Sequence, residues 1–419
     1  MKERDFDIAV IGAGAAGLAA ATVLAKAGRS TLVIDREDFA GGILRQCIHS
    51  GFGLKYYKEE LTGPEYAERA VAGAREAGAV FALGCTVTAL KPQEDGTFRL
   101  TLMSAADGVE SIHARAVVLA MGCRERNRGN LATPGTRPAG VFTAGTAQKL
   151  LNLEGRLPGR TAVIVGSGDI GLIMARRLQW CGMEVKGVVE IMPHPSGLSR
   201  NVAQCLEDFG IPLWLEHSVT RILGRDRVEG VEVTPLAQGV PDTARTFTVP
   251  CDTVLFSVGL VPETELARPA GVALNPATGG AFVDANYETS VPGVFSAGNV
   301  LHVHDLVDFV SEEAARMAQC VLKRLDGAPP APKAPNAAGA NLKYVVPSCH
   351  VPGEDLTASF RPLLVADEAL LRAEIDGETV WEKKLHFVRP AEMISVTLPG
   401  KLLDERKVTF HLQNMEETK

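Results

Sequence analysis

Two glycine motifs of the same form, at residues 12–17 and 166–171, constrain this chain more than any other feature. The first reads Gly-Ala-Gly-Ala-Ala-Gly and the second reads Gly-Ser-Gly-Asp-Ile-Gly. Each follows an apolar, strand-like run and precedes a helix-like run, and a carboxylate, Asp35 or Glu190, ends the next strand-like run. One G-x-G-x-x-G motif is weak support for a nucleotide site, but two in this setting predict two Rossmann-like dinucleotide-binding domains.

The three glycines of each motif have separate physical roles. The first permits a tight turn, the second lets the backbone approach a pyrophosphate, and the third lets the helix pack closely on the sheet. The N–H groups and the positive end of the helix then face the phosphates. A carboxylate roughly 20 residues later can accept hydrogen bonds from a ribose hydroxyl pair. The alternative interpretation is a pair of glycine-rich turns that serve packing alone.

Composition and charge narrow the class of protein. The net charge of −7, with both signs interspersed, gives no reason to expect a nucleic-acid partner. The longest run of low polarity, residues 13–25, is too short to span a bilayer, and the first strand starts too early to leave room for a signal peptide. Eight cysteines without a C-x-x-C or metal-like spacing suggest reduced thiols and no metal site. We therefore expect a cytoplasmic enzyme without a membrane span.

The order of the motifs predicts an α/β protein with one domain inserted in another. Residues 1–155 and 260–326 are expected to form the first Rossmann-like domain, which a helix over residues 308–325 closes. The second Rossmann-like domain is expected over residues 156–259. Residues 327–340 are rich in proline and alanine and indicate a linker. Alternating apolar residues beyond it predict a small C-terminal all-β module over residues 341–419.

The ordered set of motifs resembles the FAD- and NAD(P)-dependent pyridine nucleotide–disulfide oxidoreductase superfamily. Besides the two fingerprints with their carboxylates, the apolar strand that ends at residues 120–122 and the segment 293–299 carry the resemblance, which covers residues 1 to about 325. In that family the first fingerprint binds FAD and the second binds NAD(P)H. The late glycine-containing segment touches the ribityl and phosphate region of FAD.

The resemblance implies two sets of cofactor-binding residues. Those expected at FAD are Gly12, Gly14, Ala16, Gly17, Asp35, Arg36, Gly41, Gly42, Arg45, Val87, Ala120, Gly122, Gly298 and Asn299. Those expected at the nicotinamide dinucleotide are Gly166, Gly168, Asp169, Ile170, Gly171, Glu190 and Gly259. Asn299 stands where the family usually has aspartate, so it keeps a hydrogen-bonding side chain and loses a charge.

Glu190 predicts a preference between the two nicotinamide dinucleotides. Its carboxylate would repel a 2′-phosphate, and no arginine is among residues 191–193, which read Ile-Met-Pro. We therefore expect NAD(H) to be preferred over NADP(H).

Three segments, residues 42–49, 122–126 and 299–305, resemble more closely a subgroup found in anaerobic and fermentative bacteria. Its members are encoded beside glycerol-3-phosphate-dehydrogenase-like flavoproteins and a small cysteine-containing protein. More distant relatives are subunits of proline, hydroxyproline and opine dehydrogenases. The resemblance implies an oligomeric assembly in which this chain transfers electrons between NAD(H) and a partner flavoprotein dehydrogenase.

Two side chains are candidates for a catalytic role. Cys47 follows the Gly41-Gly42 pair and has no second cysteine nearby. It is either a thiolate with a lowered pKa in contact with the flavin or a packed thiol. His304 precedes the closing helix and could hydrogen-bond to the flavin or give it a proton, with Asp305 orienting the ring. The alternative for His304 is a local capping residue.

Three functions stay open at this point. The first is hydride transfer between NAD(H) and FAD, with the other half-reaction on a partner protein. The second is a stand-alone NADH oxidase, peroxidase or disulfide reductase that uses Cys47. The third is a structural subunit that binds both nucleotides within a dehydrogenase complex.

Overall fold

The structure, a computed structural model, describes residues 3–415, and the chain divides into two compact units. Unit 1 comprises residues 1–123 and 262–419, and unit 2, residues 124–261, is inserted between them. The sequence predicted that the inserted unit starts at residue 156, but in the structure it starts at residue 124. The reason is that strand β8 (Val141–Thr143) pairs in parallel with β16 (Thr253–Phe256) and therefore belongs to the second sheet.

The main sheet of unit 1 has the strand order β3-β2-β1-β6-β5-β4, and β18 also pairs with β6. Its parallel strands are β1 (Glu3–Ile11), β2 (Thr31–Ile34), β3 (Val80–Ala82), β6 (Gly108–Leu119) and β18 (Val294–Ser296). The antiparallel strands are β4 (Cys85–Pro92) and β5 (Phe98–Ser104). Residues 8–11 of β1 are buried, as expected for a strand in the centre of a covered parallel sheet.

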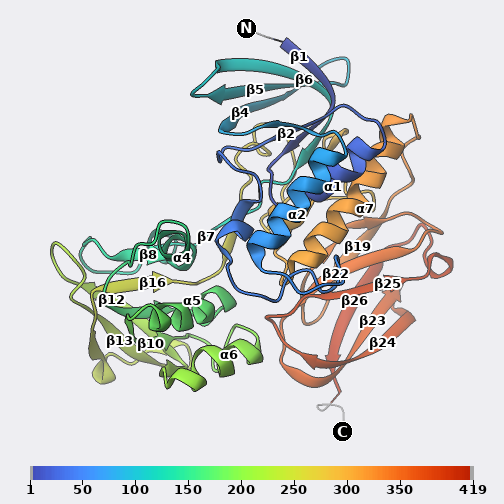
Figure 1. The fold of residues 1–419 in the computed structure, drawn as a ribbon. Coiled ribbons are helices and arrows are strands. Elements are labelled where there is room, and N and C mark those ends of the chain that lie inside the picture. Colours follow the sequence, from blue (N-terminus) through green and yellow to red (C-terminus); the bar gives the residue numbers. More distant parts are fainter. Residues whose placement is uncertain (1–2, 416–419) are drawn as a thin grey trace. The chain divides into compact units, whose positions relative to one another are not determined.

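Three helices of unit 1 lie side by side in Figure 1. They are α1 (Ala15–Lys26), α2 (Gly63–Glu76) and α7 (Val307–Leu325). Helix α1 contacts both others, because its many alanines allow close approach. Helix α2 begins with a capping box, in which the Thr62 hydroxyl accepts a hydrogen bond from the Glu65 backbone and the Glu65 carboxylate accepts one from the Thr62 backbone. The closing helix predicted at residues 308–325 is confirmed as α7.

Unit 2 is built on a parallel sheet of order β11-β10-β9-β16-β8. Besides β8 and β16 its strands are β9 (Thr161–Val165), β10 (Glu184–Val189) and β11 (Leu213–Trp214). The helices are α3 (Arg128–Leu131), α4 (Ala144–Asn152), α5 (Asp169–Trp180) and α6 (Ser199–Cys205). An antiparallel sheet follows, formed by β12 (His217–Leu223), β13 (Gly230–Ala237), β14 (Val240–Pro241) and β15 (Phe247–Pro250). At the unit boundary, β7 (Cys123–Glu125) pairs with β17 (Leu260–Pro262).

The C-terminal part of unit 1 is all β, as predicted, over the described residues to 415. Two sheets form it, ordered β21-β19-β26-β23-β24 and β20-β22-β25. Their strands are β19 (Ala334–Ala338), β20 (Leu342–Val346), β21 (Cys349–His350), β22 (Leu356–Pro362), β23 (Ala366–Ile375), β24 (Glu378–Val388), β25 (Ile394–Leu398) and β26 (Val408–Asn414). Phe360 and Phe410 pack in the core with ring centroids 4.8 Å apart. Strand β19 lies inside the segment expected to be a linker, where Asn336 is buried and donates a hydrogen bond to the Pro347 carbonyl at 3.1 Å.

One arginine attaches the C-terminal module to the segment that precedes α7. Arg361 forms an ion pair with Asp305 at 2.8 Å and donates hydrogen bonds to the carbonyls of Val303 and Ala391. The Met393 backbone N–H also donates to the Asp305 carboxylate. The side chains of Arg361 and Asp305 are only 14% and 18% exposed. Since the pair is largely shielded from water, we expect it to matter for stability.

Replacing Arg361 with methionine should lower the free energy of unfolding by about 3 kcal/mol, because the mostly buried Asp305 carboxylate loses its counter-charge. Chemical denaturation followed by circular dichroism measures this difference. Lys384→Gln is the matched control, since Lys384 and Glu368 form an exposed pair on the same module and exposed pairs contribute little. Equal effects of the two substitutions would contradict the assigned role of Arg361.

Candidate functional site

The first glycine turn connects β1 to α1 and is closely packed at two of its three glycines. Gly12 has φ +109°, and a Cβ added there would lie 2.3 Å from the Ala120 carbonyl oxygen. A Cβ on Gly17 would lie 1.9 Å from the Gly12 carbonyl oxygen. A Cβ on Gly14, in contrast, would have no atom within 4 Å outside its own neighbours. Gly14 therefore faces open space, where a pyrophosphate can approach the backbone.

Two further glycine segments lie against this turn. A Cβ on Gly42, which opens the short 3-10 helix η1 (Gly42–Gln46), would lie 3.1 Å from the Gly14 Cα. The Gly41 N–H donates a hydrogen bond to the Ala13 carbonyl at 2.8 Å. A Cβ on Gly298 would lie 2.8 Å from the Ala16 Cβ. Unit 1 therefore brings together three segments that the sequence analysis assigned to FAD.

The Asp35 carboxylate is held by backbone groups beside the same turn. Its Oδ2 accepts a hydrogen bond from the Ala13 N–H at 2.6 Å, and its Oδ1 accepts one from the Glu37 N–H at 2.9 Å. These bonds fix the carboxylate, and each oxygen keeps a lone pair that could accept a ribose hydroxyl.

A cavity of about 330 Å³ opens next to Asp35. Its lining includes Asp35, Arg36, Val87, Met121 and Glu263. This size falls in the ordinary range for small-molecule sites. The lining and the open face of Gly14 fit the adenosine end of a dinucleotide, and Val87, one of the residues expected at FAD, is part of this lining.

Of the remaining residues expected at FAD in unit 1, Ala120 and Gly122 lie after β6, and Arg45 lies in η1. The Ala120 carbonyl lies against Gly12, and a Cβ on Gly122 would meet no atom within 4 Å. Arg45 packs near Gly41, but its guanidinium lies 4.4 Å from the Phe39 ring centroid. It also lines a separate cavity of about 710 Å³ beside α2. These contacts therefore do not orient Arg45 toward the turn.

The second turn, between β9 and α5 in unit 2, repeats the geometry of the first. Gly166 has φ +91°, and a Cβ there would lie 2.1 Å from the Ser257 carbonyl oxygen. A Cβ on Gly171 would lie 2.8 Å from the Ser257 Cβ. For Gly168 the nearest atom would be 3.5 Å away, which is ordinary contact. Again the middle glycine has room for a methyl group and the outer two do not.

Glu190 repeats the hydrogen bonds of Asp35. Its Oε2 accepts from the Ser167 N–H and its Oε1 accepts from the Met192 N–H, both at 3.0 Å. Ser167 follows the first glycine of its motif as Ala13 does, and Met192 stands two residues after its carboxylate as Glu37 does. The hydroxyls of Ser167 and Ser196 also donate to Glu190 Oε2, at 2.6 and 2.8 Å. The two serines could not be predicted, because their role depends on contacts that residue spacing does not reveal.

The other residues expected at the second site are Asp169, Ile170 and Gly259. Asp169 Oδ1 accepts hydrogen bonds from the Leu198 N–H at 2.8 Å and the Asn201 amide at 2.6 Å. Its carboxylate therefore fixes the segment that leads into α6. Ile170 lies in the first turn of α5, and Gly259 follows β16 with φ +94° and no atom within 4 Å of an added Cβ.

Cys47 is a buried thiol just after η1. Its Sγ donates a hydrogen bond to the Ile43 carbonyl at 3.4 Å. Burial raises the pKa of this thiol to about 12. Since the thiol stays protonated at neutral pH, these surroundings favour the packed thiol over the thiolate with a lowered pKa.

Replacing Cys47 with serine is expected to leave the rate of flavin reduction by NADH within about twofold of wild type, because a protonated thiol supplies no nucleophile. No thiolate-to-flavin charge-transfer absorbance should develop between pH 7 and 10, since the folded pKa of the thiol is about 12. Stopped-flow spectroscopy and a pH titration of the visible spectrum measure both. A long-wavelength band at pH 8 that disappears in the serine variant would contradict this prediction.

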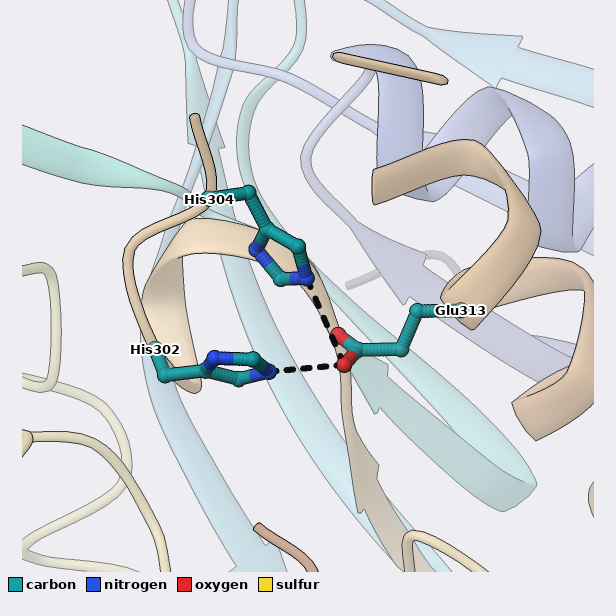
Figure 2. A group of neighbouring side chains, drawn as sticks. All are labelled: His302, His304 and Glu313. Atoms are coloured by element: carbon teal, nitrogen blue, oxygen red, sulfur yellow. Dashed lines mark hydrogen bonds and ion pairs between the residues drawn. The ribbon is translucent and has the colours of Figure 1, made fainter. Parts of the chain in front are cut away.

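A buried cluster of two histidines and one carboxylate lies at the start of α7, as Figure 2 shows. His302 Nε2 lies 2.7 Å and His304 Nε2 lies 3.4 Å from the same oxygen, Oε2 of Glu313. The other oxygen, Oε1, accepts a hydrogen bond from the Gly298 N–H at 2.8 Å. Burial tends to raise the pKa of Glu313, but the charges of His304 and His302 and their hydrogen bonds outweigh it and hold that pKa well below its usual range. Burial lowers the pKa of His302.

The structure gives His304 different partners from those expected. Asn299 Oδ1, and not Asp305, accepts hydrogen bonds from the His304 backbone N–H at 3.0 Å and from its Nδ1 at 3.3 Å. Asp305 is paired with Arg361. Glu313 was not among the predicted site residues. A carboxylate on the buried face of an amphipathic helix, close to a His-x-His sequence, is the signal that could have revealed it.

Among residues 3–415, no helix combines the length and apolar character needed to cross a membrane.

Comparisons with known proteins agree with this geometry. The profile of the family described as "Pyridine nucleotide-disulphide oxidoreductase" matches residues 6–320. The putative glutamate synthase [NADPH] small chain of Cereibacter sphaeroides is 29% identical over 348 residues, which cover 77% of this chain and 78% of that protein. An opine oxidase subunit of Agrobacterium tumefaciens is 27% identical over 70% of this chain, and the match spans 61% of its length.

A solved structure extends the likeness to three dimensions. The thioredoxin reductase of T. acidophilum matches with a TM-score of 0.62 and 25% identity, over 77% of this chain and 99% of that one. The match to the family profile ends at residue 320, before the C-terminal module.

Proposed function

This chain belongs to the pyridine nucleotide–disulphide oxidoreductase family, and from that premise we propose that it transfers a hydride between NAD(H) and FAD and exchanges the electrons with a partner protein. Members of the family are FAD-dependent enzymes that use NAD(P)H. The preference for NAD(H), the partner and the individual site residues are the parts that we add.

The repeated geometry of the two turns is the observation that carries the proposal. In each unit the middle glycine has room for a methyl group, and a carboxylate is held by the N–H that follows the first glycine. FAD, when bound, supplies the two-electron chemistry. The chain's own residues bind and orient: the turns receive the pyrophosphates, and Asp35 and Glu190 accept the ribose hydroxyls.

The cysteines support a partner as the electron acceptor or donor. The sequence contains no C-x-x-C, so it lacks the adjacent pair that would relay electrons to a disulfide substrate. Burial of Cys47 also disfavours a single reactive thiolate. Two of the relatives are by name a small chain and a subunit, which is compatible with a role inside a larger assembly.

Preference for NAD(H) follows from the charge of Glu190 and the residues after it. A 2′-phosphate on the adenosine ribose would lie close to this buried carboxylate. The next five residues, 191–195, contain no arginine or lysine that could neutralise the phosphate. The Glu190 carboxylate would therefore repel the 2′-phosphate of NADP(H).

Anaerobic stopped-flow spectroscopy tests this function. NADH should bleach the visible absorbance of the bound flavin, and NADPH should do so with a kcat/KM at least about tenfold lower, since one desolvated charge repulsion is worth more than about 1.4 kcal/mol. Equal efficiency with both nucleotides would reject the preference. A flavin spectrum that neither nucleotide changes would favour the third possibility, a subunit whose role is structural.

The partner is tested separately, by isolating the complex from its native host and identifying its proteins by mass spectrometry. A copurifying dehydrogenase that reduces the flavin of this chain with its own substrate would support the proposal. Efficient turnover of NADH with oxygen, peroxide or a disulfide by the isolated chain would support the stand-alone enzyme.

A further inference from the structure

The cluster of His302, His304 and Glu313 brings three potential metal ligands together in the interior of unit 1. Its three potential ligand atoms lie within 4.8 Å of one another, and Figure 2 shows both rings directed at one carboxylate. All three side chains are nearly or fully buried, with exposures of 0%, 1% and 4%. A buried, convergent set of two imidazoles and one carboxylate is the donor set of many metal sites.

The hydrogen bonds of His304 leave its Nε2 facing the carboxylate. Asn299 Oδ1 accepts a hydrogen bond from the His304 backbone N–H, which identifies that atom as the oxygen. The same oxygen lies 3.3 Å from His304 Nδ1, and since an amide oxygen only accepts, Nδ1 carries a hydrogen. Nε2 faces Glu313 Oε2, 3.4 Å away. Two lone pairs repel each other unless a positive charge lies between them.

His302 provides a second, independent observation. Its ring is fully buried, and its Nδ1 has no hydrogen-bond partner among the described residues. Its Nε2 lies 2.7 Å from Glu313 Oε2, the oxygen that faces His304. Both rings therefore converge on one oxygen, which a shared cation would explain.

From this geometry we propose that His302, His304 and Glu313 bind one divalent transition-metal ion, of the Zn²⁺ or Fe²⁺ type. Imidazole nitrogen favours these ions, whereas Mg²⁺ and Ca²⁺ prefer all-oxygen sites. Bonds of about 2.0–2.2 Å place neighbouring tetrahedral ligands roughly 3.3–3.5 Å apart. The His304 distance of 3.4 Å already agrees, whereas the His302 distance of 2.7 Å would have to lengthen.

Outer hydrogen bonds already orient two of the ligands, as in established metal sites. Asn299 orients the His304 ring, and the Gly298 N–H holds Glu313 Oε1, which leaves Oε2 directed at the histidines. Gly298 in turn packs against Ala16 in the first glycine turn. The metal would therefore fix the segment that precedes α7 against the proposed FAD site. This role is structural and does not depend on hydride transfer.

Metal analysis of the flavin-containing protein tests the site. Protein produced in medium with added Zn²⁺ and Fe²⁺ and then dialysed against a weak chelator should retain one ion per chain by mass spectrometry. X-ray absorption at the edge of the bound metal should show nitrogen or oxygen ligands at about 2.0–2.1 Å with the scattering pattern of two imidazoles.

Glu313→Gln is the matched variant, because its amide oxygen can still accept the Gly298 N–H. It should weaken metal binding by more than the roughly 10- to 100-fold that loss of an outer hydrogen bond costs. His386→Gln is the control: His386 also lies beside a glutamate, Glu368, but on the exposed surface, and its loss should leave the metal content unchanged. Circular dichroism establishes that both variants are folded.

Wild-type protein that retains no more metal than the Glu313→Gln variant, and binds no Zn²⁺ in calorimetric titration, would overturn the proposal. The cluster would then be an imidazolium of His304 paired with the Glu313 carboxylate. Because metal content is measured without NADH, failure of the metal site and failure of the proposed function are distinguishable.

Discussion

Replacing Gly14 with alanine is expected to give a folded protein that no longer holds FAD. Gly14 has φ −82° and ψ −171°, which alanine adopts freely, and no atom lies within 4 Å of the added Cβ. The methyl group would instead occupy the space that the pyrophosphate needs. One misplaced methylene-sized group changes binding by roughly 10- to 200-fold. The ratio of flavin to protein absorbance, and titration of the apoprotein with FAD, measure the loss.

Two other glycines of unit 1 serve as controls for this substitution. Gly73→Ala in α2 should keep FAD, because its added Cβ meets only the Thr22 hydroxyl at 3.9 Å and alanine favours a helix. Gly12→Ala should fail to fold properly, because its Cβ would lie 2.3 Å from the Ala120 carbonyl oxygen. A Gly14→Ala variant that is as yellow as wild type would show that the pyrophosphate does not pass this glycine.

The elements that the sequence predicted well are those that local chemistry determines. The glycine turns and helix α7 each carry their signal within a few neighbouring residues. The predictions were wrong where the pairing of strands that are far apart in the sequence determines the structure. Strand β8 has three residues, and its membership in unit 2 depends on β16, more than a hundred positions later. Strand β19 is rich in alanine and proline and is a strand because it pairs in parallel with β26.

In the candidate site, too, local sequence predicted some residues, and others depend on tertiary contacts. Asp35 and Glu190 could be placed from spacing, because the Rossmann-like unit sets the distance between turn and carboxylate. Glu313 could not, because its partners come from a segment whose path the sequence does not reveal. The state of Cys47 depends on burial, which raises the pKa of its thiol. Spacing therefore predicts where backbone binds a ligand, whereas side-chain clusters need the tertiary structure.

Replacing Gly168 with alanine is expected to separate the two cofactor sites, since it should keep FAD and abolish reduction by NADH at ordinary concentrations. Gly168 has φ −64° and ψ 159°, and its added Cβ would lie 3.5 Å from the Ser257 hydroxyl, so the turn should fold unchanged. The methyl group would again meet the pyrophosphate, and kcat/KM for NADH should fall by roughly 10- to 200-fold.

Stopped-flow reduction by NADH measures this loss, and reduction by dithionite, which needs no nucleotide site, should be as fast as in wild type. The Gly14→Ala variant is the reciprocal control, because it should lose the flavin while its unit 2 keeps NADH affinity in calorimetric titration. Together the two variants assign one nucleotide to each turn. Rapid bleaching of the Gly168→Ala flavin by NADH would contradict that assignment, since the middle glycine of unit 2 would then lie outside the hydride donor's site.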